Sequence, residues 1–180
     1  MKLLIASDLH GSAACCRALL AAFEREAADR IVLLGDLLYH GPRNPFPEEY
    51  DTFAVTALLN SVKDKLLCVR GNCDSEVDQM VLEFPVLAEY AFVEADGVRL
   101  FATHGHNYGP DKLPPLRPGD CLLCGHIHIP VCREMGDITY LNPGSLSLPK
   151  ENTPHSYMTL ERGVFTWKDL FTGVPFEPLH

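Results

Sequence analysis

The sequence predicts a single α/β domain over residues 1–180, with two β-sheets packed face to face. Two patterns predict this fold. In the first half, short apolar runs alternate with helical patterns, which indicates a parallel sheet with crossover helices. In the second half, β-prone runs flank Gly-containing turns, which indicates antiparallel strands. A chain of 180 residues that is 47% hydrophobic is long enough to bury one full core.

The elements of the first half follow one another in a regular order. A strand is predicted at Leu3–Ala6, and a helix then runs from Ser12, a suitable N-cap, to Ala27. The run RIVLLGD again has β-prone residues followed by Gly and Asp, and it predicts the second strand. After the Pro-rich loop HGPRNPFP, a second helix is predicted over Glu48–Leu59, and KLLCVRGNCD supplies the third strand. Strand, helix, strand, helix and strand make a parallel sheet.

The second half contains three strand pairs. YAFVEADGVRLFATHGH places two strands around Asp96-Gly97, a strong hairpin signal. VCREMGDITYLN and SYMTLERGVFTWKDL each predict a strand, a turn with glycine and a second strand. The Pro-rich loop and the tail FTGVPFEPLH either cover a sheet edge or form a partner surface, so a homo-oligomer, dimer or tetramer, remains open.

Composition limits the function classes. The formal charge of −9, from 15 basic and 24 acidic residues, argues against sequence-independent binding to nucleic acid. Seven cysteines without a signal-peptide pattern indicate reduced thiols and a cytoplasmic protein. The apolar run at the N-terminus is too short for a secretory segment or a membrane span, so no membrane partner is expected.

Five apolar runs end in residues that bind metals. They are Asp8, His10, Asp36, Asn72, His104, His126 and His128. Because side chains just past the carboxyl ends of strands converge on one crevice in open α/β folds, we expect them to meet. Taken singly, Asp8 is better explained as a turn or helix-cap residue and His128 as a core histidine. Together, two buried carboxylates and four imidazoles require compensating cations.

The donor types narrow the choice of metal. Carboxylate, amide oxygen and imidazole suit Mn²⁺, Fe²⁺ or Zn²⁺ better than a thiolate-bound structural zinc. Seven donors exceed one tetrahedral shell, which favours two ions that share a bridging carboxylate, roughly 3.5–4 Å apart. Cys121 and Cys124 beside the histidine pair resemble a zinc-finger line, but on a strand they point to opposite faces, so we interpret them as core thiols.

The motifs DLH, GD, GNCD, THGH and GHIH, in that order, resemble the calcineurin-like metallophosphoesterase superfamily. RGNCDSEVDQM and NPGSLSLPK further resemble its YfcE-type bacterial phosphodiesterases. The resemblance implies a four-layer α/β/β/α sandwich with two mixed sheets. It also implies metal-dependent hydrolysis of small phosphodiesters by a hydroxide that two metal ions activate. Mn²⁺ is the expected ion, with Zn²⁺, Fe²⁺ and Mg²⁺ as alternatives.

The resemblance also implies roles for the seven residues. Asp8, His10 and His128 would hold one ion, Asn72, His104 and His126 the other, and Asp36 would bridge them. If the GHIH segment is extended, His126 and His128 share a face and can each reach a different ion. Asn72 would in addition stabilise charge on the phosphoryl oxygens.

One position departs from the superfamily pattern. Most members have GNH, whose histidine is taken to protonate the leaving oxygen, whereas this chain has Cys73. A thiol with a pKa of about 8.5 is a poor general acid. His106 is a candidate substitute. Asp74 either orients its neighbour or caps the short helix in DSEVDQM. Three further residues are candidates for phosphate contact, although turn chemistry or solvated surface explains them better: Ser145, Arg70 and Arg43.

Two other functions compete with a phosphodiesterase. The same fold serves as a non-catalytic scaffold in a retromer subunit, where metal-binding positions are lost and an apolar patch binds a partner. All seven ligand positions here keep metal-competent residues, which favours an enzyme. A phosphomonoesterase or nuclease of the same superfamily is the second alternative, and the acidic balance without an aromatic platform disfavours a nuclease.

Overall fold

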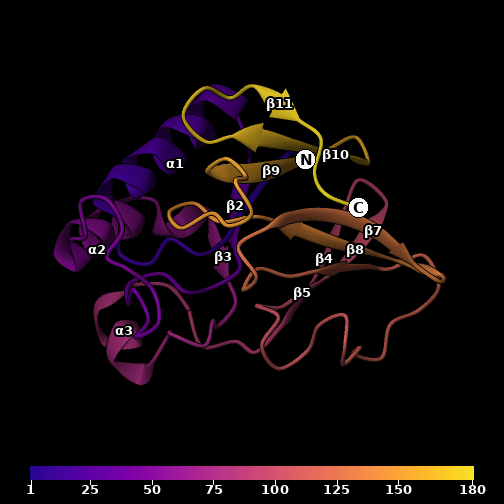
Figure 1. Cartoon of the computed structure of the whole chain (residues 1–180), viewed down its shortest axis with the longest axis horizontal. Helices are drawn as coiled ribbons and strands as arrows, with labels where there is room; N and C mark the ends of the chain where they lie inside the picture. Colours follow the sequence, from indigo (N-terminus) through magenta and orange to yellow (C-terminus); the bar gives the residue numbers. More distant parts are fainter.

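The computed structural model describes residues 1–180 as two mixed β-sheets packed face to face, with two longer helices against one of them (Figure 1). The first sheet has six strands in the order β11 (Pro175–Phe176), β10 (Val164–Asp169), β9 (Ser156–Glu161), β1 (Leu3–Ala6), β2 (Arg30–Leu33) and β3 (Leu66–Cys68). The second has five, in the order β4 (Ala91–Ala95), β5 (Val98–Ala102), β6 (Cys121–Leu123), β8 (Ile138–Pro143) and β7 (Pro130–Met135). The predicted α/β class with two mixed sheets is confirmed.

The directions of the strands follow the sequence patterns. β1, β2 and β3 are parallel neighbours, and the hairpins β4–β5, β7–β8 and β9–β10 are antiparallel. The β4–β5 turn places Asp96 and Gly97 at φ values of +52° and +80°, the conformation that an Asp-Gly hairpin turn requires. β6 pairs in parallel with both β5 and β8, so this centre of the second sheet is parallel.

Two helices, α1 (Ala13–Glu26) and α2 (Thr52–Ser61), lie on the outer face of the six-stranded sheet. A 3₁₀ turn at Lys63–Lys65 and the six-residue α3 (Glu76–Val81) are the other helical elements. α1 begins at the predicted N-cap, Ser12, whose side chain accepts a hydrogen bond from Cys15 N–H. α3 begins with a capping box formed by Ser75 and Asp78, so Asp74 is not its cap.

The predicted start of α2 at Glu48 is four residues too early. Asp51 is the N-cap, with its side chain accepting from Ala54 N–H. The residues before it form a turn, with Glu49 at φ +47°, and are bonded to the β1–α1 turn. Ala13 N–H donates to Glu49 O, and Asp51 N–H donates to Gly11 O. These long-range bonds occupy the backbone groups that a longer helix would have needed.

Successive side chains along each strand point to opposite faces of the sheet, and this alternation divides the core into layers. Leu4, Ala6 and Leu33 face the helices in a cluster of 22 buried residues. Leu3, Ile5 and Val32 face the second sheet in a cluster of 14. Cys121 and Cys124 fall in different clusters, the inter-sheet core and the outer face of the second sheet, as the core-thiol interpretation predicted.

The outer face of the five-stranded sheet carries the segment of residues 103–120 instead of a helix. Leu116 packs against the outer cluster, and Tyr108 meets Phe101 edge to face at 6.3 Å between ring centroids. The fourth layer therefore differs in detail from the predicted helical layer. None of the helices combines the length and apolarity needed to cross a bilayer.

Candidate metal centre

All seven predicted ligand residues lie together at the ends of the two sheets. Asp8 and His10 follow β1, Asp36 follows β2 and Asn72 follows β3, while the remaining three follow strands of the second sheet: His104 after β5, and His126 and His128 after β6. Asp8, His10, Asp36, His104 and His128 are at most 3% exposed. His126 is half-buried and Asn72 is exposed, so the cluster opens to solvent on their side.

The backbone at five of these residues is left-handed. Their φ values are +60° for Asp8, +49° for His10, +56° for Asp36, +70° for His126 and +63° for His128. Non-glycine residues adopt this conformation rarely and at a cost. The expectation of an extended GHIH segment is therefore wrong: β6 ends at Leu123, and two left-handed residues in the following bend aim both imidazoles at the site.

A glycine contact joins the turns after β2 and β3. A Cβ on Gly35 would lie 2.3 Å from Gly71 N, and a Cβ on Gly71 would lie 2.1 Å from Asp36 Oδ1. The buried carboxylate of Asp74 completes the junction by accepting from the backbone N–H groups of Asp36, Leu37 and Gly71 at 2.7–2.9 Å. Asp74 thus holds the bridging candidate in place through its backbone, and no hydrogen bond joins it to the Cys73 side chain.

Two groups of donor atoms flank Asp36. On one side, Asp8 Oδ1 lies 3.2 Å from His128 Nε2 and 3.6 Å from His10 Nε2. On the other side, His104 Nε2 lies 3.1 Å from Asn72 Oδ1 and 3.3 Å from His126 Nδ1. The Oδ2 atom of Asp36 lies between them, 3.7 Å from His10 Nε2 and 3.4 Å from His104 Nε2.

The hydrogen bonds of the imidazoles show that the donor set fits cations. The Nδ1 atoms of His10, His104 and His128 lie 2.8, 2.7 and 2.7 Å from the carbonyl oxygens of Tyr39, Leu34 and Leu148. Since a carbonyl only accepts, each Nδ1 carries a proton, and Nε2 is the ring nitrogen that faces the cluster and could offer a lone pair to a cation. His10 Nε2 and His128 Nε2 face each other at 3.3 Å, and buried Asp8 Oδ1 has no hydrogen-bond donor. Divalent cations would satisfy these atoms.

The electrostatics of the cluster also favour positive charge. Burial opposes ionisation of Asp8, but His10 and His128 outweigh it and hold the pKa of Asp8 well below its usual range. Burial likewise opposes charge on His104, yet Asp36 and Asp8 outweigh it and raise the pKa of His104 to about 9. The proton on His104 balances the negative charge of the two carboxylates, which a bound metal cation would otherwise balance. Burial and the charge of His104 lower the pKa of His126.

The two candidate acids have distinct surroundings. Cys73 donates its backbone N–H to Asp36 Oδ1 at 2.8 Å, and its thiol accepts from Asn72 Nδ2 at 3.2 Å. Burial, with the charge of Asp36, raises the pKa of Cys73 to about 12, so its thiol remains protonated. His106 lies 5.4 Å from His104 between ring centroids, and its buried Nδ1 has no partner. Burial and His104 lower the pKa of His106.

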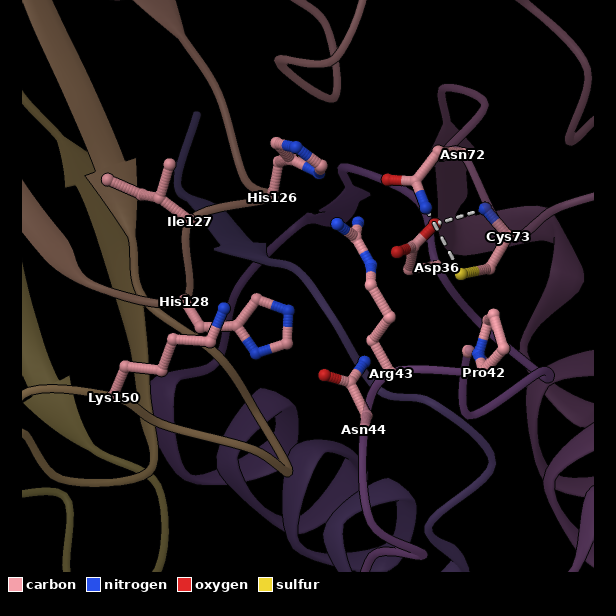
Figure 2. A pocket seen from close by; sticks show the side chains of 11 residues that line it. Asp36, Pro42, Arg43, Asn44, Asn72, Cys73, His126, Ile127, His128 and Lys150 are labelled. Carbon is pink, nitrogen blue, oxygen red and sulfur yellow. Dashed lines mark hydrogen bonds between the residues drawn. The ribbon is translucent and has the colours of Figure 1, made fainter.

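The cluster opens into a cavity of about 480 Å³ (Figure 2). Its lining residues are Asp36, Gly41, Pro42, Arg43, Asn44, Asn72, Cys73, His126, Ile127, His128 and Lys150. Arg43 is solvent-exposed, as predicted, and its side chain also lines the cavity. Lys150 was not predicted, although it ends the NPGSLSLPK motif, which begins in the last two residues of β8, and that position was the available signal.

The other two candidates for phosphate contact have different roles. The hydroxyl of Ser145 is fully buried; it donates to Asp8 O at 3.0 Å and accepts from Leu148 N–H at 3.0 Å. Arg70 donates from Nε to Asp74 O at 3.1 Å and lies near Glu89. Neither side chain lines the cavity, so both support neighbouring loops instead of contacting substrate.

Two mixed sheets whose strand ends gather carboxylates and imidazoles have the arrangement of a metallophosphoesterase. The calcineurin-like phosphoesterase superfamily domain matches residues 1–163, and the chain belongs to that superfamily. More particularly, it is 48% identical over 166 residues to Phosphodiesterase YfcE of Escherichia coli strain K12, covering 92% of this chain and 90% of that protein. The solved structure of that E. coli phosphoesterase superposes with a TM-score of 0.95 at 45% identity, over 99% of this chain and 98% of the other.

More distant relatives share the fold. A phosphodiesterase of Methanocaldococcus jannaschii is 24% identical over 152 residues, covering 80% of this chain and 83% of that protein. Vps29 of Entamoeba histolytica, solved in complex with zinc, superposes with a TM-score of 0.59 at 20% identity, over 98% of this chain and 96% of the other. At that identity the likeness shows the shared fold alone.

Proposed function

We propose that this chain is a metal-dependent phosphodiesterase that hydrolyses small phosphodiesters with two divalent ions. The observation that carries the proposal is the pair of donor groups on either side of Asp36. Asp8, His10 and His128 would hold one ion, and Asn72, His104 and His126 the other. Asp36 Oδ2, within 3.7 Å of an imidazole from each group, would bridge them.

The residues of the chain would bind and orient the phosphoryl group. Bound divalent ions would supply activation of the attacking water and stabilisation of charge on the phosphoryl oxygens. Asn72, exposed at the rim with its amide next to the cluster, would donate from Nδ2 to a phosphoryl oxygen. The donor set of oxygen and imidazole nitrogen supports Mn²⁺, with Zn²⁺, Fe²⁺ and Mg²⁺ as alternatives.

The surroundings of Cys73 support a preference for esters with good leaving groups. Its thiol, with a pKa of about 12, gives up a proton too reluctantly to serve as an efficient acid near neutral pH. His106, whose pKa lies below that of an ordinary histidine, is the alternative acid. Aryl phosphodiesters, which lose their alcohol without protonation, are the expected test substrates.

The relatives support the diester over the monoester. The E. coli and M. jannaschii relatives are both named phosphodiesterases. We extend that activity to this chain because the two sequences are 48% identical over an alignment that covers about nine-tenths of each. A cytoplasmic location and a homo-oligomer, dimer or tetramer, complete the proposal.

The test compares bis(4-nitrophenyl) phosphate with 4-nitrophenyl phosphate, using metal-stripped protein refilled with Mn²⁺, Zn²⁺, Fe²⁺ or Mg²⁺. We expect no turnover after stripping, recovery with Mn²⁺, and a diester rate at least about tenfold above the monoester rate. Asp36→Asn should abolish recovery, and the exposed Asp64→Asn serves as the matched control. A diester rate that is indifferent to metal, or a monoester preference, would overturn the proposal.

The scaffold alternative predicts a different outcome. Vps29, which shares the fold, is the type of relative that motivates it. An exposed apolar groove does exist beside α2 and α3, lined by residues that include Tyr39, Phe53 and Val77. A pure scaffold would show no turnover with any of the four ions.

A further inference from the structure

Two cationic side chains line the cavity without a partner. Arg43 comes from the loop after β2, and Lys150 from the segment after β8. Neither takes part in any of the chain's ion pairs. In Figure 2 the Arg43 guanidinium extends toward the middle of the cavity, and the Lys150 side chain ends beside the side chain of His128. The chain has more acidic than basic residues, and yet these two basic side chains at the candidate active site form no ion pair.

The backbone fixes both residues beside the metal-binding cluster. Lys150 N–H donates to His128 O at 3.1 Å, and Lys150 O accepts from the Thr153 hydroxyl at 2.7 Å. A candidate ligand and the lysine are therefore joined directly. Because the N–H and the carbonyl of Lys150 are both hydrogen-bonded, the backbone of this residue is held in place, and less conformational entropy is lost when its side chain binds a ligand.

The loop that carries Arg43 is held in a similar way. Asn44 Nδ2 donates to His40 O at 2.9 Å, and Asn44 N–H donates to Gly41 O at 3.2 Å. The aromatic rings of His40, Phe46 and Tyr50 then pack against one another, with centroid separations of 4.4 Å for His40–Phe46 and 5.0 Å for Phe46–Tyr50. The guanidinium is thus presented from an ordered loop.

The remaining lining of the cavity indicates what kind of group these cations meet. Only Pro42 and Ile127 are hydrophobic, and no aromatic carbocycle is present, so a base or an acyl chain would find no apolar platform. The cavity, at about 480 Å³, has room for more than the phosphodiester group at the cluster. Charge is therefore the main feature by which this wall can recognise the rest of a substrate.

We propose that Arg43 and Lys150 bind a second anionic group of the substrate, a phosphate, so that the substrate class is a small phosphodiester carrying an additional phosphate on one arm. This inference rests on the proposed phosphodiesterase function. Arg43 supplies a planar fork of donors and Lys150 a point charge, the combination that suits a phosphate with several exposed oxygens. Both cations are solvent-exposed, so they bind without the cost of deep desolvation.

A matched pair of substrates tests the inference. Thymidine 5′-(4-nitrophenyl phosphate) and its 3′-phosphorylated form differ by one phosphate and release the same chromophore. On the Mn²⁺-loaded enzyme we expect kcat/KM to be at least about tenfold higher for the 3′-phosphorylated form, mainly through KM, as charge-assisted hydrogen bonds allow. The double variant Arg43→Gln/Lys150→Gln should bring that ratio close to one.

A second double variant controls for net charge. Arg117→Gln/Arg162→Gln removes two other cations that form no ion pair and do not line this cavity, so it should keep the preference of the native enzyme. Equal kcat/KM values for the two diesters on the native enzyme would overturn the inference while leaving the phosphodiesterase intact. A preference that survives Arg43→Gln/Lys150→Gln would also overturn it.

A binding measurement separates this inference from the proposed function. Isothermal titration of the protein as purified, with thymidine 3′,5′-bisphosphate and with thymidine 5′-monophosphate, needs no turnover. We expect the bisphosphate to bind at least about tenfold more tightly, and Arg43→Gln/Lys150→Gln to remove that difference. If no diester is hydrolysed with any ion, the proposed function fails. Equal affinities in the titration would then refute the two-cation site as well.

Discussion

Five of the seven candidate ligands hold a left-handed backbone, and this conformation places their side chains. At Asp8 and His10, and again at His126 and His128, the two residues are separated by one intervening residue. The left-handed residues turn both side chains of each pair toward the cluster, where an extended chain would have continued the strand. Strain of this kind, of order 1–3 kcal/mol per residue, persists where surrounding bonds enforce it. Two hydrogen bonds of this kind hold Asp8: the buried hydroxyls of Ser145 and Ser147 both donate to Asp8 O.

Cys73 provides the prediction at the scale of a single residue. Cys73→His places an imidazole beside Asn72 and Asp36, where it can protonate a departing alcohol. Because general-acid catalysis contributes about 10²–10⁴-fold, we expect hydrolysis of an alkyl phosphodiester to rise at least about tenfold, with a smaller change for bis(4-nitrophenyl) phosphate. Steady-state rates on both esters check this. No gain on the alkyl ester would count against the leaving-group argument.

The turns after β2 and β3 act as one unit at the scale of elements. Gly35 and Gly71 allow the two backbones to touch, and the Asp74 carboxylate ties them through three N–H groups. This contact sets the separation between Asp36 and the Asn72 segment. Two strands alone would fix the direction of these side chains but not their distance.

A methyl group at the turn contact should disturb the metal site more than the fold. In Gly71→Ala the new Cβ would meet Asp36 Oδ1 at 2.1 Å and Asp36 N at 2.4 Å, so the carboxylate has to move. We expect the variant to bind less Mn²⁺ per chain and to lose at least about tenfold in diester turnover, as misplacement of catalytic groups predicts. Metal analysis and kinetics measure both. Gly97→Ala, whose new Cβ meets nothing within 4 Å but whose backbone at φ +80° strains any side chain, is the control for a loss of stability away from the site, and it should keep its Mn²⁺.

The end of α1 is joined to the six-stranded sheet by a buried carboxylate. Glu26 accepts from Tyr157 Oη at 2.7 Å and from Lys168 Nζ at 2.7 and 2.8 Å, and pairs with Lys2 at 2.9 Å. Burial opposes ionisation, but these partners outweigh it and lower the pKa of Glu26 to about 2. One side chain thus links the helix to β9, β10 and the N-terminal segment.

Replacing this carboxylate should make stability less dependent on acid. Glu26→Gln should lower the free energy of unfolding by about 2–3 kcal/mol at pH 7. Since the pKa is lowered on folding from 4.5 to about 2, this contribution is complete above pH 4.5 and is lost as the pH falls toward 2. Urea unfolding of both proteins from pH 7 to pH 2.5 measures the difference. A difference that grows on acidification would contradict the account.

At the scale of the whole molecule, the C-terminal tail joins the two sheets (Figure 1). β11 pairs with the β10 edge of the first sheet. Leu179 then lies against the β7 edge of the second sheet, where Cys132 N–H donates to Leu179 O and Leu179 N–H donates to Pro130 O. Of the two predicted roles for this tail, covering a sheet edge is therefore the one that the structure shows.

Removal of the tail should weaken the whole domain. Deleting residues 177–180 removes the two backbone bonds to β7 together with the buried Pro178. At about 0.5–1.5 kcal/mol for each bond, we expect a loss of at least about 1–3 kcal/mol in unfolding free energy. Leu179→Ala keeps those bonds and removes only a half-exposed side chain, so it should change stability by less than about 0.5 kcal/mol. Urea unfolding compares the three proteins. Equal losses in both variants would assign the effect to the side chain.

Features that depend on local residue patterns were predicted from the sequence, whereas features that depend on contacts between distant segments were not. Strands, hairpins and ligand types follow from residue patterns, so the candidate donors Asp8 and His128 could be named from the sequence alone. The late start of α2 depends on backbone bonds to Gly11 and Ala13. The place of Lys150 at the cavity depends on its bond to His128 O, between segments far apart in the chain. The left-handed backbone at the candidate ligands could not be predicted, because Asp and His indicate a positive φ far less clearly than glycine does.

The central claim is that two divalent cations lie on either side of the Asp36 carboxylate. Anomalous scattering from crystals grown with Mn²⁺ tests it most directly. The account predicts two peaks roughly 3.5–4 Å apart, one beside Asp8, His10 and His128 and the other beside Asn72, His104 and His126. A single peak, or a cluster without anomalous signal at saturating Mn²⁺, would contradict it.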